Sequence, residues 1–315
     1  MDNFLLSAEV VLPLFLMMAL GYLLRRILEL DDRWIELTNK VIFRALLPLL
    51  LFRNMYESDL SGMSAPGMAG VVFLCIGALV VTFLALNMLI PRLEKENARR
   101  GVLIQGMFRG NAAIFGIPIA TLLFGENNIS IVVLLLACVV PLLNVCSVIA
   151  LERFRFDKTD WRHVLYQIAT NPLIIGILLG LLLNALRIAL PSPVKSAAWS
   201  LASSTTPVSF LALGASFTFA SAAKNRRELT GVVLFKLVLL PLLWVGLAGL
   251  LGYRNQQLAG VLLVFGPPAA VSSFPMACAM GGDTQLSSEI VVFTSIFSIL
   301  TIFLWIFGLK SLGWI

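Results

Sequence analysis

The sequence predicts an all-α integral membrane protein with ten transmembrane helices in two inverted five-helix repeats. Three observations lead to this prediction: an apolar composition, recurring apolar windows of helical length, and motifs of the first half that return in the second. Of the 315 residues, 59% are hydrophobic and 13% are charged, and the mean hydropathy is +0.95. Soluble domains average roughly 25% charged residues. Lipid must therefore cover the apolar surface of this chain.

Apolar windows separated by short charged segments run along the chain. The hydrocarbon core of a bilayer is roughly 30 Å thick and needs about 20 apolar residues per helix. Only helices and closed barrels satisfy the backbone in lipid, and these windows are too long and too uniform for barrel strands. The predicted spans are residues 4–24, 34–56, 67–90, 100–123, 129–151, 164–186, 196–220, 229–252, 257–280 and 288–309.

Lys and Arg concentrate in every second connecting segment, at residues 25–33, 92–100, 153–162 and 224–227. Cytoplasmic loops of membrane proteins are enriched in Lys and Arg, so the pattern predicts that both termini lie on the outer, periplasmic side. This topology also accounts for the net charge of +6, and no nucleic-acid-binding module is present. Residues 4–24 lack the flanking signals of a signal peptide and are expected to be a retained helix.

Cysteine and histidine usage gives no sign of a metal or redox site. The single histidine, His163, cannot build a His-based metal site alone, so neither a metal nor a cofactor is expected. The cysteines are expected to be buried apolar side chains rather than disulfides. They are Cys75, Cys138, Cys146 and Cys278, all within apolar windows.

Motifs of the first half recur in the same order in the second half. The repeat unit holds five helices, an odd number, so the two halves face opposite ways in the membrane. Inverted repeats of this kind are typical of secondary transporters. The expected division is residues 1–151, a cytoplasmic connecting loop at 152–163, and residues 164–315. The matching motifs are Pro13-Leu14 with Pro172-Leu173, Gly21 with Gly180, Pro48 with Pro207, Gly70-Val71-Val72 with Gly231-Val232-Val233, Ala112-Ala113 with Ala269-Ala270, Pro118 with Pro275, and Gly125 with Gly282.

The fourth and ninth windows each carry Gly and Pro near mid-span, as RGNAAIFGIP at 109–118 and GPPAAVSSFP at 266–275. A proline inside a helix removes a hydrogen bond, which lipid tolerates where the freed groups line a cavity or find protein partners. Two helices broken at matching places predict the binding site, although prolines can also merely kink packed helices. Pro118 and Pro275 are expected to begin the second half-helices, whose positive N-termini favour an anion.

Arg109 lies near the middle of the fourth span, where a charge costs at least roughly 2.5–3.5 kcal/mol on insertion scales. A substrate carboxylate and a structural partner are both open as the group that offsets this cost. Asn111 is expected to contact the substrate. The predicted substrate-binding residues are Arg109, Asn111, Ala112, Pro118, Asn144, Pro267, Pro268, Ser272, Ser273 and Pro275.

Other polar residues fall in neighbouring spans. Thr205, Thr206 and Ser209 could line the same cavity as Asn144, but packing between helices is the favoured role for all four. Lys236, Lys40 and Arg44 either face the cavity or extend to the inner surface, and the second role is favoured for Lys40. Acidic residues are not expected near mid-depth, which argues against a cation antiporter and favours an anionic substrate.

Three segments together resemble the auxin efflux carrier family. They are residues 109–118, the run Asn171-Pro172-Leu173-Ile174-Ile175-Gly176 followed by Asn184, and residues 267–272 with Gly281-Gly282-Asp283. The resemblance covers essentially the whole chain. It implies a scaffold domain and a transport domain, a substrate site where the fourth and ninth helices cross, and alternating access. On the family pattern the site residues are Arg109, Asn111, Pro118, Pro267, Pro268 and Pro275.

The resemblance also implies an organic anion as the substrate, which is auxin in plants and a dicarboxylate such as malate or malonate in bacteria. The connecting loop at 152–163 lacks the long hydrophilic stretch of many plant members, so a prokaryotic-type carrier of the inner membrane is expected. The expected partners are this anion and the lipid bilayer, without nucleic acid, and a homodimer remains open.

An enzyme is not expected. Intramembrane enzymes need paired aspartates, a Ser–His pair or an HExxH motif, and none falls at a suitable depth. A transporter of a non-anionic small molecule, or a receptor or channel on the same fold, remains the alternative. The exact substrate, the direction of transport and the coupling ion are left open by the sequence.

Overall fold

The computed structural model describes residues 2–58, 68–125, 129–155 and 161–315. These residues form helices, and no strand longer than a single bridge occurs among them. The helices of the first half are α1 (Asp2–Ile27), α2 (Asp32–Val41), α3 (Leu47–Tyr56), α4 (Met68–Leu93), α5 (Asn97–Phe108), α6 (Ala112–Phe124), α7 (Ser130–Arg153) and α8 (Trp161–Ala169). Those of the second half are α9 (Pro172–Ala185), α10 (Ser192–Ser216), α11 (Phe219–Lys224), α12 (Arg226–Leu234), α13 (Leu240–Leu250), α14 (Asn255–Phe265), α15 (Ser273–Ala279) and α16 (Thr284–Ser311).

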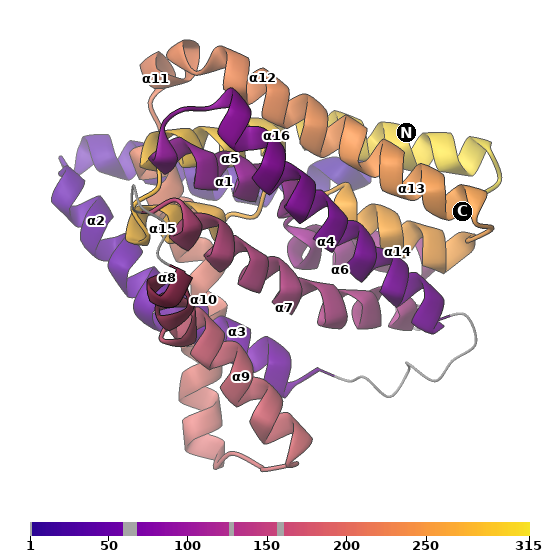
Figure 1. Ribbon diagram of the computed structural model, residues 1–315, viewed down its shortest axis with the longest axis horizontal. Coiled ribbons are helices and arrows are strands. Elements are labelled where there is room, and N and C mark those ends of the chain that lie inside the picture. The colour runs from indigo at the N-terminus through magenta and orange to yellow at the C-terminus, as the bar shows by residue number, and fades with distance from the viewer. Residues whose placement is uncertain (1, 59–67, 126–128, 156–160) are drawn as a thin grey trace.

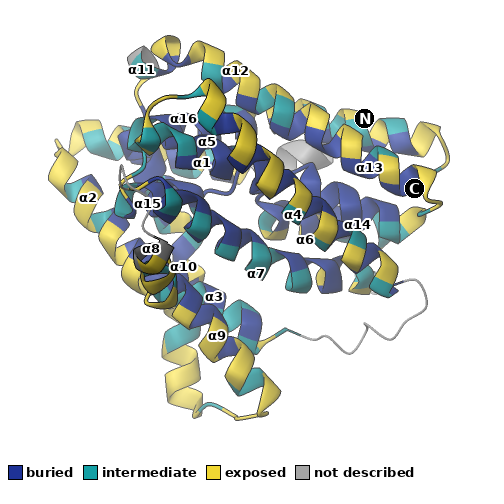
Figure 2. Ribbon diagram, in the orientation of Figure 1, coloured by how far each residue is buried: buried dark blue, intermediate teal, exposed yellow. Residues whose placement is uncertain are grey.

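Within the described residues, four helical stretches are long and apolar enough to cross a membrane. They are α4, α7, the continuous stretch Arg226–Leu250 and α16, while α6, α9 and α14 are shorter apolar helices. Large apolar side chains such as Leu84 and Leu304 are about half exposed on outer helix faces, and exposed residues cover much of the outside of the molecule in Figure 2. An apolar exterior of this kind is what lipid contact requires.

Two stretches contain a π-helical turn just before a proline. Ile42–Leu46 joins α2 to α3 ahead of Pro48, and Phe235–Leu239 joins α12 to α13 ahead of Pro241. A proline cannot donate the usual helical hydrogen bond, and a π turn is one way for a helix to adjust locally. The second turn carries Lys236, which is fully buried.

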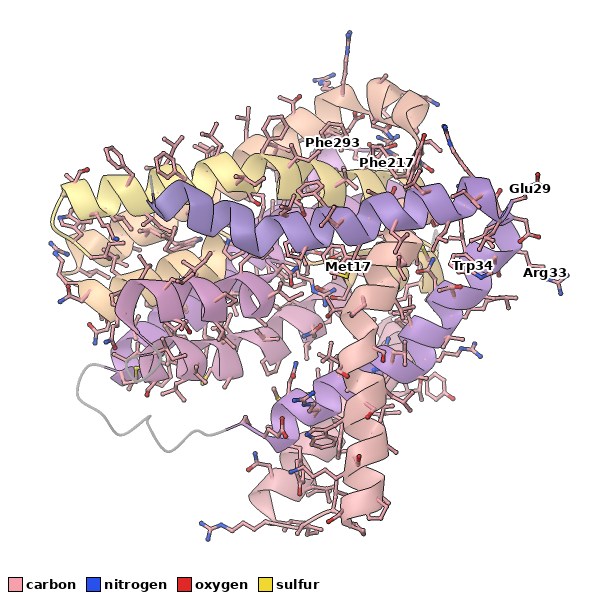
Figure 3. The ribbon with its side chains drawn as sticks, turned by 180° about the vertical axis from the view of Figure 1, so that it is seen from behind. Met17, Glu29, Arg33, Trp34, Phe217 and Phe293 are labelled. Carbon is pink, nitrogen blue, oxygen red and sulfur yellow. The ribbon has the colours of Figure 1, made fainter. Side chains whose placement is uncertain are left out.

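Glycines bring α1 against α10 and α3 against α9 (Figures 1 and 3). A Cβ atom on Gly21 would lie 2.1 Å from the carbonyl oxygen of Leu211, and one on Gly180 would lie 2.5 Å from that of Phe52. Small residues permit such close approach of helix backbones in membranes. Gly21 and Gly180 are 159 positions apart, and so are Phe52 and Leu211. The two helix pairs therefore use equivalent contacts.

Polar side chains at the ends of the same helices show the same shift of 159 positions between equivalent contacts. Arg25 Nη1 donates to the carbonyl of Ala215 at 2.8 Å, and Asn184 Nδ2 donates to that of Tyr56 at 3.0 Å. Arg25 and Asn184 are again 159 positions apart, as are Tyr56 and Ala215. Each side chain ties its helix to a carbonyl near the end of its partner helix.

The predicted fourth and ninth spans are each interrupted by non-helical backbone. Residues 109–111 separate α5 from α6, and residues 266–272 separate α14 from α15. The interruptions meet in an isolated antiparallel bridge between Gly110 and Ala269. The N–H of Asn111 donates to the carbonyl of Pro268 at 2.8 Å. The bridge thus satisfies backbone groups that two broken helices leave without helical partners.

The second half-helices do not both begin where proline predicts. Helix α15 begins at Ser273, so Pro275 lies in its first turn. Helix α6 begins at Ala112, and Pro118 lies well inside it, so the prediction for Pro118 is wrong. The break in this span instead coincides with the bridge at Gly110.

Candidate functional site

Arg109 is the C-terminal cap that follows α5, and its guanidinium is enclosed by protein, with only 4% of the residue exposed. Nη2 donates to Asn144 Oδ1 at 2.6 Å and to Ser272 Oγ at 2.7 Å, while Nη1 lies 2.7 Å from Met276 Sδ. Asn144 Nδ2 donates to the carbonyl of Val140 on its own helix, which aims Oδ1 at the guanidinium. These three side-chain partners of the Arg109 guanidinium are all uncharged.

No Asp or Glu of the described residues forms an ion pair with Arg109. A buried charge usually has an opposite charge beside it, because burial without one is costly. A thioether sulfur is a weak acceptor for a guanidinium donor. The positive charge of Arg109 is thus hydrogen-bonded but not neutralised by a side chain.

A cavity of about 210 Å³ opens beside Arg109. It lies between the broken helices on one side and α3, α7 and α10 on the other. Asn111, at the N-terminal end of α6, lines the cavity, and no hydrogen bond of its side chain is recorded among the described residues. The first residues of α6, Ala112 to Ile114, line it too. A helix start with free N–H groups facing a cavity favours an anion there.

Helix α10 contributes hydroxyl groups to the same wall. Thr205, Thr206 and Ser209 all line the cavity. Thr205 Oγ1 donates to the carbonyl of Leu46 at 3.0 Å, so it also ties α10 to the π turn after α2. The buried Ser209 Oγ has no hydrogen-bond partner within the described part of the chain. Helix packing, the role expected for these residues, holds for Thr205, while Ser209 has a hydroxyl free for a ligand.

The structure brings together half of the predicted site residues. Arg109, Asn111, Ala112, Asn144 and Ser272 line the cavity. The remaining predicted residues, which the cavity lining does not include, are Pro118, Pro267, Pro268, Ser273 and Pro275. Pro268 contacts a cavity-lining residue through its backbone, because its carbonyl accepts a hydrogen bond from the N–H of Asn111.

A second cavity, of about 530 Å³, lies farther along the same helices, toward the start of α2 and the ends of α7 and α15. It is lined by charged groups of both signs. Lys40 pairs with Glu36 at 2.5 Å and Arg155 with Glu152 at 3.1 Å, whereas no ion pair of Arg44 is recorded among the described residues. One face of the stretch from α2 to α3 lines both cavities.

The sequence does not assign three buried charged residues to the core, which are Glu152, Lys236 and Glu289. Lys236 Nζ lies 3.4 Å from the carbonyl oxygen of Phe108 and 3.2 Å from that of Phe265. Glu289, near the start of α16, is fully buried and accepts a hydrogen bond from Asn225 Nδ2 at 2.7 Å. Lys236 sits in an apolar run that gives no sign of its partners, and Glu289 falls at the edge of the last predicted span.

A search against family models finds one that is described as a membrane transport protein. It matches residues 6–158 and 161–306, which is nearly the whole chain. The gap between the two matched segments falls within the predicted connecting loop at 152–163.

Two curated relatives match over their full length. An uncharacterized transporter of Methanothermobacter thermautotrophicus is 22% identical over 303 residues, which cover 96% of this chain and 98% of the relative. An uncharacterized transporter of Methanocaldococcus jannaschii is 24% identical over an alignment of 327 positions that covers 99% of each chain. Both names state transport without a substrate.

Proposed function

Because the chain belongs to the family of membrane transport proteins, as the resemblance to auxin efflux carriers predicted, we propose that it is a secondary active transporter of a small organic anion. The observation that carries the choice of substrate is the environment of Arg109. Its buried guanidinium contacts only neutral acceptors, at distances of 2.6–2.7 Å. A carboxylate entering the cavity would supply the missing negative charge and accept from the guanidinium.

The size of the cavity limits the substrate. A cavity volume of about 210 Å³ favours a small substrate. Mono- and dicarboxylates with three or four carbons, such as malonate and malate, fit a space of this order. Asn111, Ser209 and the start of α6 provide uncharged donors for a second carboxylate or a hydroxyl.

Alternating access across the inner membrane is the proposed mechanism. Ten spans in two inverted halves, 1–151 and 164–315, are supported by the equivalent contacts of α1 with α10 and of α3 with α9. The cavity lies where these glycine-packed helices face the broken helices, so sliding of one group past the other would expose it to either side. The charge pattern favours both termini on the outer side.

Transport assays in proteoliposomes test this proposal. Labelled malonate, malate and related mono- and dicarboxylates are offered to wild type, to Arg109→Ala and to Arg92→Ala. Arg92 is an exposed arginine in the last turn of α4 and serves as the matched control. We expect saturable uptake that unlabelled internal substrate accelerates, that Arg92→Ala retains, and that Arg109→Ala lowers by at least about 100-fold.

The alternatives predict different outcomes. Carboxylate uptake that is indifferent to Arg109 in a folded variant would refute the assigned site. Uptake of a neutral or cationic compound only would refute the anion assignment and favour a carrier of another substrate class. Flux that never saturates and shows no counterflow would indicate a channel, and saturable binding without flux would indicate a receptor.

A further inference from the structure

Lys236 lies in the interior of the helix bundle, far from either end of its helical stretch. It occupies the π turn between α12 and α13, and its exposed fraction is 0%. A lysine in such a place is costly unless its ammonium is paired or hydrogen-bonded. Lys236 is not among the residues that line the 210 Å³ cavity. The substrate proposal therefore leaves this charge unexplained.

The ammonium meets the ends of two half-helices. Phe108 and Phe265 are the last residues of α5 and α14, and their carbonyl oxygens lie 3.4 and 3.2 Å from Lys236 Nζ. The last carbonyls of a helix lack helical partners and carry its negative end. Both broken spans thus direct the negative ends of their first halves at one ammonium.

The charges at this point balance without an acidic side chain. Each helix C-terminus is equivalent to roughly half a negative elementary charge, so two of them offset about one positive charge. No Asp or Glu in the described part of the chain forms an ion pair with Lys236. The buried Glu289 bonds Asn225 instead. The single positive charge of Lys236 is about equal and opposite to the summed partial charges of the two helix C-termini.

Only one backbone residue separates the ammonium from the cavity. A Cβ atom on Gly110 would lie 3.1 Å from Lys236 Nζ, and Gly110 itself lines the cavity. Lys236 therefore adds a second positive charge behind the wall that carries Arg109, and it does so without taking up space in the cavity.

Carbonyl oxygens at the ends of broken helices are the groups that hold coupling cations in many secondary transporters. We propose that Lys236 is a built-in cation that occupies this position between the ends of α5 and α14, so that transport requires no Na⁺ or K⁺. The part of this inference that concerns transport rests on the proposed anion carrier. The part that concerns the cation position rests on the contacts of Lys236 alone.

Wild-type protein gives the first test and needs no variant. Uptake of malonate and malate into proteoliposomes is measured with Na⁺, K⁺ or choline as the only monovalent cation on both sides. We expect initial rates that agree within about twofold, because the position is already filled by a tethered charge. A fall of roughly tenfold or more in choline would overturn the proposal.

Removing the side chain should create a vacancy that a free cation fills. Lys236→Ala leaves the carbonyls of Phe108 and Phe265 without a partner, so we expect a lower melting temperature and uptake reduced at least about tenfold. Ethylammonium carries the ammonium group that the variant lacks, so it should restore both the melting temperature and the uptake with a saturable concentration dependence. Lys236→Met fills the space without a charge, so ethylammonium should not change its melting temperature or its uptake. Lys95→Ala, at an exposed lysine, is the matched control and should behave as wild type.

The two readouts separate this inference from the substrate proposal. The melting temperature of the detergent-solubilised protein does not depend on any substrate. Ethylammonium that stabilises Lys236→Ala but not Lys236→Met supports the built-in cation even if no carboxylate is transported. Wild-type stability and uptake of Lys236→Ala in choline without ethylammonium would refute the built-in cation but not the proposed anion transport. If Lys236→Ala does not fold, the comparison of Na⁺, K⁺ and choline media with the wild-type protein is the deciding test.

Discussion

The two interruptions that meet at the centre of the molecule differ in length and in chemistry. The first consists of residues 109–111 and carries a charged and an amide side chain. The second consists of residues 266–272 and carries Pro267 and Pro268 but no ionisable group. The first supplies the guanidinium, while the second supplies the backbone carbonyl of Pro268 and the hydroxyl of Ser272 that hold the first in place.

We infer that the two segments make different contributions to the proposed site. A short break positions a side chain well because few backbone angles are free, and the bridge at Gly110 fixes them further. The longer break has no Lys or Arg of its own, so no second side-chain charge competes for the ligand at the cavity. Substitutions in the first break should therefore affect ligand binding more than substitutions in the second.

The largest effect in this comparison is expected for Arg109→Lys, which keeps the charge. A lysine cannot reproduce the planar fork that reaches Asn144, Ser272 and a ligand together. Charge-assisted hydrogen bonds contribute ~1.5–3 kcal/mol each, so the apparent affinity for a carboxylate should fall roughly 100-fold. Concentration-dependent uptake and the thermal stabilisation of the purified protein by ligand both measure this change. Wild-type affinity in Arg109→Lys would show that only charge, and not geometry, matters at this position.

Much of this arrangement follows from sequence pattern. Most apolar windows anticipate helical stretches to within several residues, but the window 164–186 covers the end of α8 and the separate helix α9. Arg109 attracts notice because a charge in an apolar run is rare. The neighbours of Arg109 are harder to predict, since Asn144 lies in α7 and Ser272 in the second break, and only the fold places them 2.6–2.7 Å from the guanidinium.

Proline was the less reliable guide. Pro118, Pro267, Pro268 and Pro275 indicate helix breaks in the sequence, yet breaking a helix and lining a cavity are different properties. A proline lacks a backbone donor and leaves a carbonyl one turn earlier without its helical partner, which does not require the proline itself to line a cavity.

Lys236 could not be placed from the sequence, because its partners are backbone carbonyls. Any residue type supplies such a carbonyl, so Phe108 and Phe265 leave no signature in the sequence. The position becomes visible only when two helix ends are seen to meet. In the structure, Lys236 lies in the π turn ahead of Pro241, and this turn shifts the helix face that carries the lysine.

A smaller effect is expected for Asn111→Ala in the first break. The side chain lines the cavity without a recorded protein partner among the described residues, so its loss should affect the ligand rather than the fold. One lost hydrogen bond to a charged ligand corresponds to a rise in KM of roughly tenfold with little change in melting temperature. Asn111→Asp is the matched variant, since it keeps the size but repels an anion, and it should lower affinity further. A large loss of thermal stability in Asn111→Ala would instead assign this side chain to the fold.

The smallest effect is expected for Ser272→Ala in the second break. Its Oγ accepts from Arg109 Nη2 at 2.7 Å, but the same nitrogen also donates to Asn144, and a bound carboxylate can take the vacated direction. Loss of about 1 kcal/mol of positioning corresponds to a rise in KM of roughly fivefold. Because the substitution removes a support and not a ligand contact, Ser272→Thr, which keeps the hydroxyl, should recover most of the wild-type KM. If Ser272→Ala matched Arg109→Lys in severity, the second break would bind substrate directly and the proposed division of roles would fail.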